Sequence, residues 1–246
     1  MPGTAVRRIL LIDAVPWGRD HPPGHPLRDV ATWFTPHLTA PGGVEIRCVT
    51  PDGGLEGEPA SDVAGVVLSG SPRDAWGPDP VNEVLCGVIH RCRTRRIPFL
   101  GVCYGHQLLG RALGGRVGRD PAGWELGTVP LRLTPAGERS PLFRGIPAEF
   151  QALQSHADAV LELPPGCELL ASGTHTEIQS FSCESLLFGV QFHPETSPGI
   201  LKFLWGPRVG AWRGRIGFDL DRRLESLEPA PVAAGVLSNF INHILP

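Results

Sequence analysis

Short apolar runs recur along the first hundred residues and alternate with stretches that can form helices. The helical stretches are Leu27–Leu38 and Val81–Arg93. The strand-like runs are RRILLID (7–13), VEIRCV (44–49), GVVLS (65–69) and IPFLGV (97–102). Because strands that alternate with helices form βαβ units, this pattern predicts an α/β fold with an open, mainly parallel central sheet that is flanked by helices.

The pattern changes in the middle of the chain, where strand-like runs follow one another with little helical sequence between them. These runs are GTVPLRLT (127–134), EFQAL (149–153), CELLAS (167–172) and LLFGVQF (186–192). Strands that are separated only by turns favour a mixed or antiparallel arrangement. We therefore expect an antiparallel extension of the sheet within the same domain.

The end of the chain is predicted to be helical. We assign residues 1–205 to a catalytic domain and residues 206–246 to a helical C-terminal extension that packs on it. Two segments of the extension have helical character: FDLDRRLESLEP (218–229) and AAGVLSNFINHIL (233–245). In the first, Leu220, Leu224 and Leu227 share one face, which we expect to be buried.

Composition and charge narrow the class of protein. The 246 residues contain 41% apolar and 19% charged residues, which is ordinary for a globular protein, and no apolar run approaches the ~18–20 residues that cross a bilayer. The net charge of −3 without a basic block argues against nucleic acid as a partner. The first apolar run, Ile9–Ile12, is shorter than the ~7–15 residues of a signal peptide core, so we expect a first strand and a cytoplasmic protein.

The cysteines and histidines outside the motifs below do not suggest a metal site. Six cysteines are scattered along the chain, and we expect free thiols: 48, 86, 92, 103, 167 and 183. Cys86 and His90 share one face of a predicted helix, but Cys92 lies on a different face. No second pair of cysteine or histidine residues completes the tetrahedral ligand set of a zinc ion. We therefore favour a role in helix packing for these three residues. Neither a metal nor a cofactor is expected.

Two further sets of residues have more than one interpretation. The loop Ala14–Pro26 is rich in proline and glycine, and its Trp17, His21 and His25 are compatible with a substrate lid or with a disordered loop. Four tryptophans are expected in the core or in an interface and not at a cofactor: Trp76, Trp124, Trp205 and Trp212.

The stretch FLGVCYGHQLLG (99–110) places a cysteine between an apolar strand and a helix. Gly-x-Cys-x-Gly is the cysteine form of a nucleophile elbow, a strained strand-to-helix turn that holds a reactive side chain above the sheet. Gly101 and Gly105 leave room for the turn. The N–H groups at the start of the helix favour the thiolate of Cys103, and the N–H of Tyr104 would point toward a developing oxyanion.

A thiolate nucleophile needs a base, and the base needs a group that orients it. The run FGVQFHPET (188–196) ends a second apolar strand with His193, Pro194 and Glu195. Open α/β sheets place their sites at this edge. His193 could accept the thiol proton and return it to a leaving amine, while Glu195 could hold the other ring nitrogen.

At these residues the sequence resembles the class I glutamine amidotransferases, which release ammonia from glutamine with a Cys–His–Glu triad. The matching motifs occur in the order of the family: VVLSGSP (66–72), PFLGVCYGHQLLGRALGG (98–115), QSHADAV (154–160) and GVQFHPE (189–195). The resemblance spans Arg8 to about Thr196 and implies a flavodoxin-like sheet. Stand-alone members are the most similar, namely GMP synthase glutaminase domains and plant γ-glutamyl peptidase-like proteins.

The resemblance implies a role for eleven residues. Cys103 would be the nucleophile, His193 the base and acid, and Glu195 the orienting carboxylate. The oxyanion hole would use Ser71 and Tyr104, where Ser71 replaces a glycine that many members carry and could narrow the pocket. The remaining residues would bind the glutamyl group: Gly70, Gln107, Ser155, His156, Ala157 and Asp158.

The resemblance implies hydrolysis of the γ-amide of glutamine or of a γ-glutamyl compound through a γ-glutamyl thioester. Three functions stay open at this point. The chain could be a glutaminase that supplies ammonia to a separate synthase subunit, since no synthetase signature follows. It could be a self-sufficient hydrolase that removes glutamate from a γ-glutamyl conjugate or biosynthetic intermediate, or a non-catalytic binding protein that retains the fold.

Overall fold

The computed structural model describes residues 6–16, 25, 28, 30–40 and 43–245. Trp17 and His21 of the proposed lid lie outside the described residues. Within the described part, no helix is long and apolar enough to span a bilayer.

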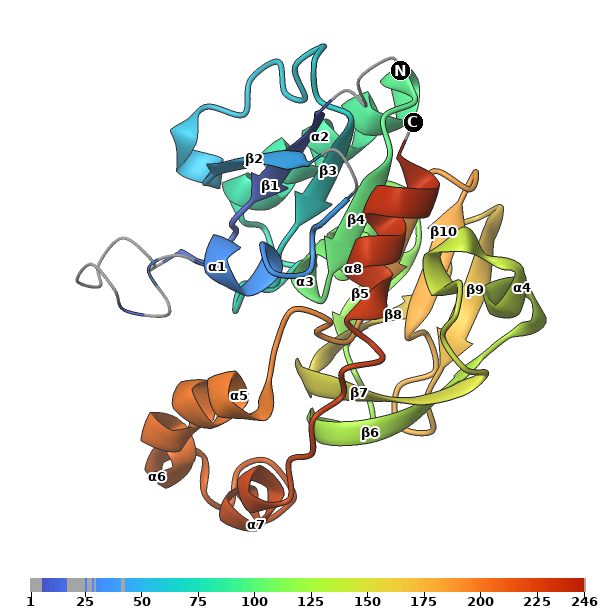
Figure 1. The fold of residues 1–246 in the computed structure, drawn as a ribbon. Coiled ribbons are helices and arrows are strands. Elements are labelled where there is room, and N and C mark those ends of the chain that lie inside the picture. Colours follow the sequence, from blue (N-terminus) through green and yellow to red (C-terminus); the bar gives the residue numbers. More distant parts are fainter. Residues whose placement is uncertain (1–5, 17–24, 26–27, 29, 41–42, 246) are drawn as a thin grey trace.

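A nine-stranded sheet forms the centre of the molecule (Figure 1). Its first five strands run parallel, in the spatial order β2, β1, β3, β4 and β11. Their bounds are Val44–Val49, Arg7–Ile12, Gly65–Leu68, Phe99–Val102 and Leu187–Val190 respectively. Every residue of β3, β4 and β11 is buried, as expected for parallel strands that are covered on both faces.

The other four strands of this sheet are antiparallel and continue it in the order β10, β9, β6 and β7. Their bounds are Ser180–Cys183, Cys167–Ser172, Glu125–Leu133 and Glu149–His156. A separate antiparallel ribbon joins β5 (Arg116–Arg119) to β8 (Asp158–Glu162). The predicted fold class, a mainly parallel sheet with an antiparallel extension, is confirmed.

Helices cover both faces of the parallel strands. The α-helices are α1 (Ala31–Phe34), α2 (Pro80–Arg95), α3 (Tyr104–Ala112), α4 (Pro135–Arg139), α5 (Pro198–Trp205), α6 (Val209–Trp212), α7 (Leu220–Glu225) and α8 (Gly235–Asn239). Single turns of 3-10 helix occur at Pro51–Gly53, Pro141–Phe143 and Gly206–Arg208, and α8 continues into a π-helical turn, Phe240–Ile244.

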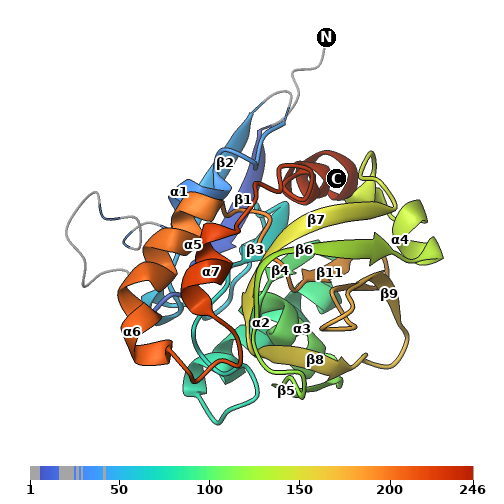
Figure 2. The same ribbon diagram turned by 90° about the horizontal axis from the view of Figure 1, so that it is seen from below.

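The two faces of β1 show how the sheet separates two cores. Ile9 and Leu11 pack in one apolar cluster with α1, α8 and the π-helical turn. Leu10 and Ile12 pack in the other cluster with α2 and α3. The alternation follows from the period-two geometry of a strand. The C-terminal helix therefore lies on the opposite side of the sheet from α2 and α3 (Figure 2).

A third apolar cluster holds helices α5 to α7 against the antiparallel strands. Leu220, Leu224 and Leu227 are buried in it, as their spacing predicts, together with Leu126 of β6 and Leu153 of β7. Figure 1 shows these helices beyond the carboxyl ends of the parallel strands. The chain then returns to the first core through α8.

The prediction of six free thiols is wrong for one pair. Cys167 of β9 and Cys183 of β10 form a disulfide, with their Cα atoms 4.4 Å apart. The two residues are directly opposite in the antiparallel register. Their separation of 16 residues gave no sign of this pairing, because the register of two strands is not visible in the spacing of cysteines.

Candidate active site

Cys103 occupies a sharp turn between β4 and α3. Its backbone has φ 50° and ψ −102°, a conformation that side-chain-bearing residues rarely adopt. A Cβ at position 101 would collide with the carbonyl of Gly105, and one at position 105 would lie 2.6 Å from the carbonyl oxygen of Leu68. Both glycines are therefore required by the close approach of the backbone.

A hydrogen-bonded pair of glutamines lies next to the Cys103 sulfur. The Nε2 amide of Gln191 donates to Sγ at 3.6 Å, and its Oε1 accepts a hydrogen bond of 3.2 Å from Gln107. Gln107 also donates to the carbonyl of Asp158 at 2.7 Å. Sequence reasoning missed Gln191. The available signal was its place in GVQFHPE, directly after a strand that pairs in parallel with the strand before Cys103.

His193 and Glu195 lie beside this cysteine. The Nδ1 atom of His193 is 2.7 Å from Oε1 of Glu195, whose side chain is only 3% exposed. Burial lowers the pKa of His193, but the Glu195 carboxylate and a hydrogen-bonded Cys103 outweigh it and hold that pKa well above its usual value. This setting therefore favours the protonated form of the imidazole.

The loop after β3 passes close to the cysteine and the histidine. A Cβ at Gly70 would lie 3.0 Å from Cε1 of His193 and 3.6 Å from Cβ of Cys103. The Ser71 hydroxyl donates to the carbonyl of Ala14 at 2.8 Å and accepts from the Arg73 N–H at 3.3 Å. These bonds tie the loop to the segment that follows β1.

The residues where β7 ends and β8 begins are held by polar contacts within the protein. His156 Nε2 is 3.0 Å from the Glu125 carboxylate, and both side chains are buried. Asp158 accepts from the Trp76 indole at 3.0 Å and pairs with Arg119 at 3.2 Å. Burial raises the pKa of Asp158, and the nearby Asp74 also raises it, against the opposing effects of Arg119 and Trp76.

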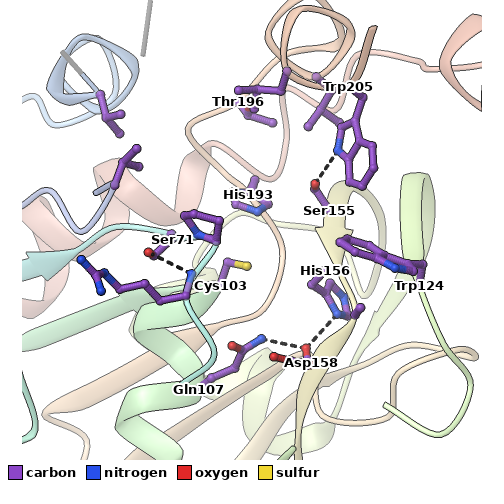
Figure 3. Close-up of a pocket in the computed structure, with 18 of the residues that line it drawn as sticks. Ser71, Cys103, Gln107, Trp124, Ser155, His156, Asp158, His193, Thr196 and Trp205 are labelled. Carbon is purple, nitrogen blue, oxygen red and sulfur yellow. Dashed lines mark hydrogen bonds between the residues drawn. The ribbon is translucent and has the colours of Figure 1, made fainter. Parts of the chain in front are cut away.

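A cavity of about 410 Å³ brings together ten of the eleven predicted site residues. The exception is Tyr104, whose side chain is buried in the core. As the first residue of α3, Tyr104 still has an N–H group without an intrahelical acceptor. Figure 3 shows Gln107 and Asp158 on one side of the Cys103 sulfur, with His193, Thr196 and Trp205 on the other.

Of the four tryptophans expected in the core or in an interface, Trp124, Trp205 and Trp212 pack in or against the third apolar cluster, while Trp76 is 46% exposed. Trp124, Trp205 and Trp212 line the same cavity. Their indole rings pack edge to face, with centroids 5.0 to 6.1 Å apart. Sequence reasoning missed this role because an apolar residue has the same appearance in a core and in a pocket wall.

No metal site emerges in the part of the chain that the structure describes, where no three His, Cys, Asp or Glu side chains are grouped to hold an ion. Cys86 and Cys92 are buried on α2, as expected for packing, while His90 is exposed. Burial raises the pKa of the Cys92 thiol to about 12, so it stays protonated at neutral pH.

Comparisons with known proteins agree on one family. The model of the class-I glutamine amidotransferases matches residues 37–202. A glutamine-hydrolysing GMP synthase subunit of Thermococcus kodakarensis is 34% identical over 157 residues, which cover 63% of this chain and 78% of that protein. Gamma-glutamyl peptidase 3 of Arabidopsis thaliana is 35% identical over 140 residues. This match covers 56% of this chain and 56% of the peptidase, little more than half of either protein.

Among solved structures, a glutamine amidotransferase from Thermotoga maritima has the same fold. The TM-score is 0.73 at 22% sequence identity, and the alignment covers 96% of this chain and 97% of that one. With the family match over residues 37–202, the resemblance inferred from the motifs is confirmed. The chain belongs to the class-I glutamine amidotransferase family.

Proposed function

We propose that this protein hydrolyses the γ-amide of glutamine or of a γ-glutamyl compound with a Cys103–His193–Glu195 triad. The observation that carries the proposal is the buried His193–Glu195 hydrogen bond of 2.7 Å beside a cysteine on a strained elbow. A nucleophile, a proton carrier and an orienting carboxylate are the parts that covalent amide hydrolysis needs.

The first half of the reaction forms a thioester. The Cys103 sulfur attacks the γ-carbonyl carbon, and the carbonyl electrons move to the oxygen to give a tetrahedral oxyanion. The N–H groups of Ser71 and Tyr104 are the donors we assign to that oxygen. His193 gives its proton to the amine nitrogen, the C–N bond breaks, and the amine leaves.

The second half of the reaction hydrolyses the thioester and regenerates the free enzyme. A water molecule loses a proton to His193 as its oxygen attacks the thioester carbon, and the C–S bond then breaks to release glutamate and the Cys103 thiolate. Two moderate barriers replace one high barrier, which is the benefit of a covalent intermediate. Gln107 and residues 155–158 are the groups that we assign to the glutamyl moiety, because they line the cavity beside the sulfur.

A second candidate is a glutaminase that passes ammonia to a separate synthase. It is favoured by the 34% identity to a GMP synthase subunit, of which the match covers 78%. It differs from the first candidate in that a second protein would accept the released amine.

The charge of Glu195 is expected to set the alkaline limit of activity. Removing a negative charge beside the imidazolium destabilises the protonated ring, so the pKa of His193 falls in the Glu195→Gln variant. In the variant the imidazolium therefore deprotonates at a lower pH. A deprotonated ring has no proton to give to the leaving amine. The alkaline limb of kcat/KM should move to lower pH, and the maximum should fall by about tenfold or more.

The measurement is a pH–rate profile of both proteins with one γ-glutamyl amide. Glu184→Gln is the matched control, since Glu184 pairs with Arg93 and Arg96 at the surface. Its alkaline limb should coincide with that of the wild type. An unchanged limb in Glu195→Gln would show that this carboxylate does not act on His193.

The intermediate itself provides the direct test of the proposed function. Rapid acid quenching during turnover, followed by intact mass measurement, should reveal a fraction of chains that carry a glutamyl group. Peptide mapping should place the group on the buried Cys103 and not on Cys48, which is exposed. Turnover that proceeds in Cys103→Ala as fast as in the wild type would refute the thioester route.

A further inference from the structure

The cavity extends well beyond the space beside the Cys103 sulfur. Its volume is about 410 Å³, within the range of ~300–1,000 Å³ of sites that enclose drug-sized molecules. Next to Ser155, one of the residues assigned to the glutamyl group, the cavity is bounded by apolar side chains, which we call the tryptophan wall: Trp124, Leu201, Leu204, Trp205 and Trp212. A free glutamine has no apolar group to place against this wall.

The wall is held in a defined orientation. The Trp205 indole N–H donates to the Ser155 hydroxyl at 2.9 Å, so its one polar atom is satisfied by the protein. Trp124 contacts Trp205 at 5.0 Å and Trp212 at 5.5 Å between centroids, with interplanar angles of 90° and 73°. Such edge-to-face pairs fix the indole rings and leave apolar surface for a ligand.

The wall lies on the side of the sulfur where the leaving amine departs. Gln107 and Asp158 are on the opposite side of Cys103 from Trp205, and His193, the proton donor to the amine, is on the same side as Trp205 (Figure 3). Helix α5 also begins at Pro198, so only Thr196 and the N-cap Ser197 separate it from Glu195. A substituent on the amide nitrogen would therefore extend from the imidazole toward the wall.

The charge on the segment that bears the wall disfavours one class of amine, although the carboxylates Asp74, Asp158 and Glu195 line other parts of the cavity. Among the lining residues of the segment 198–212, Arg208 is the one that carries a charge, and its guanidinium donates to the Leu204 carbonyl at 2.6 Å. A cationic substituent would approach this guanidinium in an apolar surrounding, where like charges repel strongly. Neutral aromatic substituents meet no such barrier.

We propose that the tryptophan wall is a leaving-group subsite, and that the substrate is a γ-glutamyl amide of an amine that carries an uncharged aromatic group. This inference rests on the proposed function, because it assigns the amine that the Cys103 thiolate displaces. Binding energy from the aromatic group would be used to hold the amide in place for attack. Free glutamine would then be a poor substrate.

Three γ-glutamyl amides with alkyl amine leaving groups test the inference: the 2-phenylethylamide, the ethylamide and the 4-aminobutylamide. We expect kcat/KM for the phenylethylamide to exceed that for the ethylamide by about tenfold or more, since one apolar group in a fitting pocket gives roughly 10- to 200-fold discrimination. The cationic aminobutylamide should be no better than the ethylamide.

Variants of the wall should change this ratio. Trp212→Ala and Leu204→Ala should each lower the preference for the phenylethylamide over the ethylamide at least threefold. Because this preference is a ratio of two kcat/KM values of the same variant, partial unfolding does not change it. Both residues are only partly buried. Phe203→Ala is the matched control, because Phe203 is on the same helix as Leu204, is 40% exposed and is not a lining residue. It should keep the wild-type ratio.

The outcomes separate the two proposals. Equal kcat/KM for the three amides, or a preference for free glutamine, would overturn the subsite while turnover that depends on Cys103 would still support the proposed function. A preference for the aminobutylamide would also overturn it. Absence of turnover with every amide and with glutamine would overturn the proposed function, and the subsite with it.

Discussion

Replacing Cys103 by alanine is expected to lower kcat/KM for a γ-glutamyl amide by at least ~10⁴-fold, the order of loss when a member of a catalytic triad is removed. Without the sulfur no thioester forms, and His193 and Glu195 have no nucleophile to assist. The fold should persist, because alanine fits the space of a side chain that is 5% exposed. Steady-state release of glutamate is the measurement.

The control for this loss is Cys48→Ala. Cys48 is exposed on the edge strand β2 and does not line the active-site cavity. Its variant should keep the wild-type rate within about twofold, since surface substitutions away from the site have small effects. Equal losses in the two variants would mean that the assay reports a general sensitivity to cysteine replacement, and the role of Cys103 would be unsupported.

The second large effect is expected from the glycine before the elbow. In Gly101→Ala the new methyl group would collide with the Gly105 carbonyl and lie 2.7 Å from the His106 nitrogen, both of which belong to the backbone and cannot be moved by a rotamer change. The turn has to shift, and unfolding free energy should fall by about 3 kcal/mol or more. Denaturant titration followed by circular dichroism measures this change.

Gly210→Ala provides the comparison for this glycine. Gly210 is exposed on α6, and nothing lies within 4 Å of the place that its new methyl group would take, other than its own neighbours in the helix. Alanine favours a helix over glycine by up to about 1 kcal/mol, so this variant should be neutral or slightly more stable. Similar denaturation midpoints for the two variants would contradict the steric account of the elbow.

The elbow was predictable because its determinants are local in sequence. Gly101, Cys103 and Gly105 are two residues apart, and the strand before and the helix after them are visible as apolar patterns. The parallel sheet was predictable for the same reason, since each βαβ unit is built from neighbouring segments. His193 and Glu195 became candidates only in combination with the cysteine elbow, because a histidine at the end of a strand is uninformative by itself.

The features that sequence reasoning missed depend on contacts between distant segments. Gln191 reaches Cys103 only because β11 pairs beside β4. The Cys167–Cys183 disulfide depends on the register of β9 and β10. Strand order and register are set by the whole sheet, so a local pattern of residues does not contain them.

Helices α5 to α7 have their own apolar cluster, and the chain is anchored in the central cores both before and after them. The proposed reaction centre instead depends on the loops after β3, β4 and β11. Substitutions in α5 to α7 that keep this cluster and the Trp205–Ser155 hydrogen bond are therefore expected to alter the tryptophan wall and not the Cys103–His193–Glu195 arrangement. The proposed leaving-group subsite and the proposed triad thus belong to separate parts of the fold, so exchanging α5 to α7 would change which amine is released and leave the residues that cleave the bond in place.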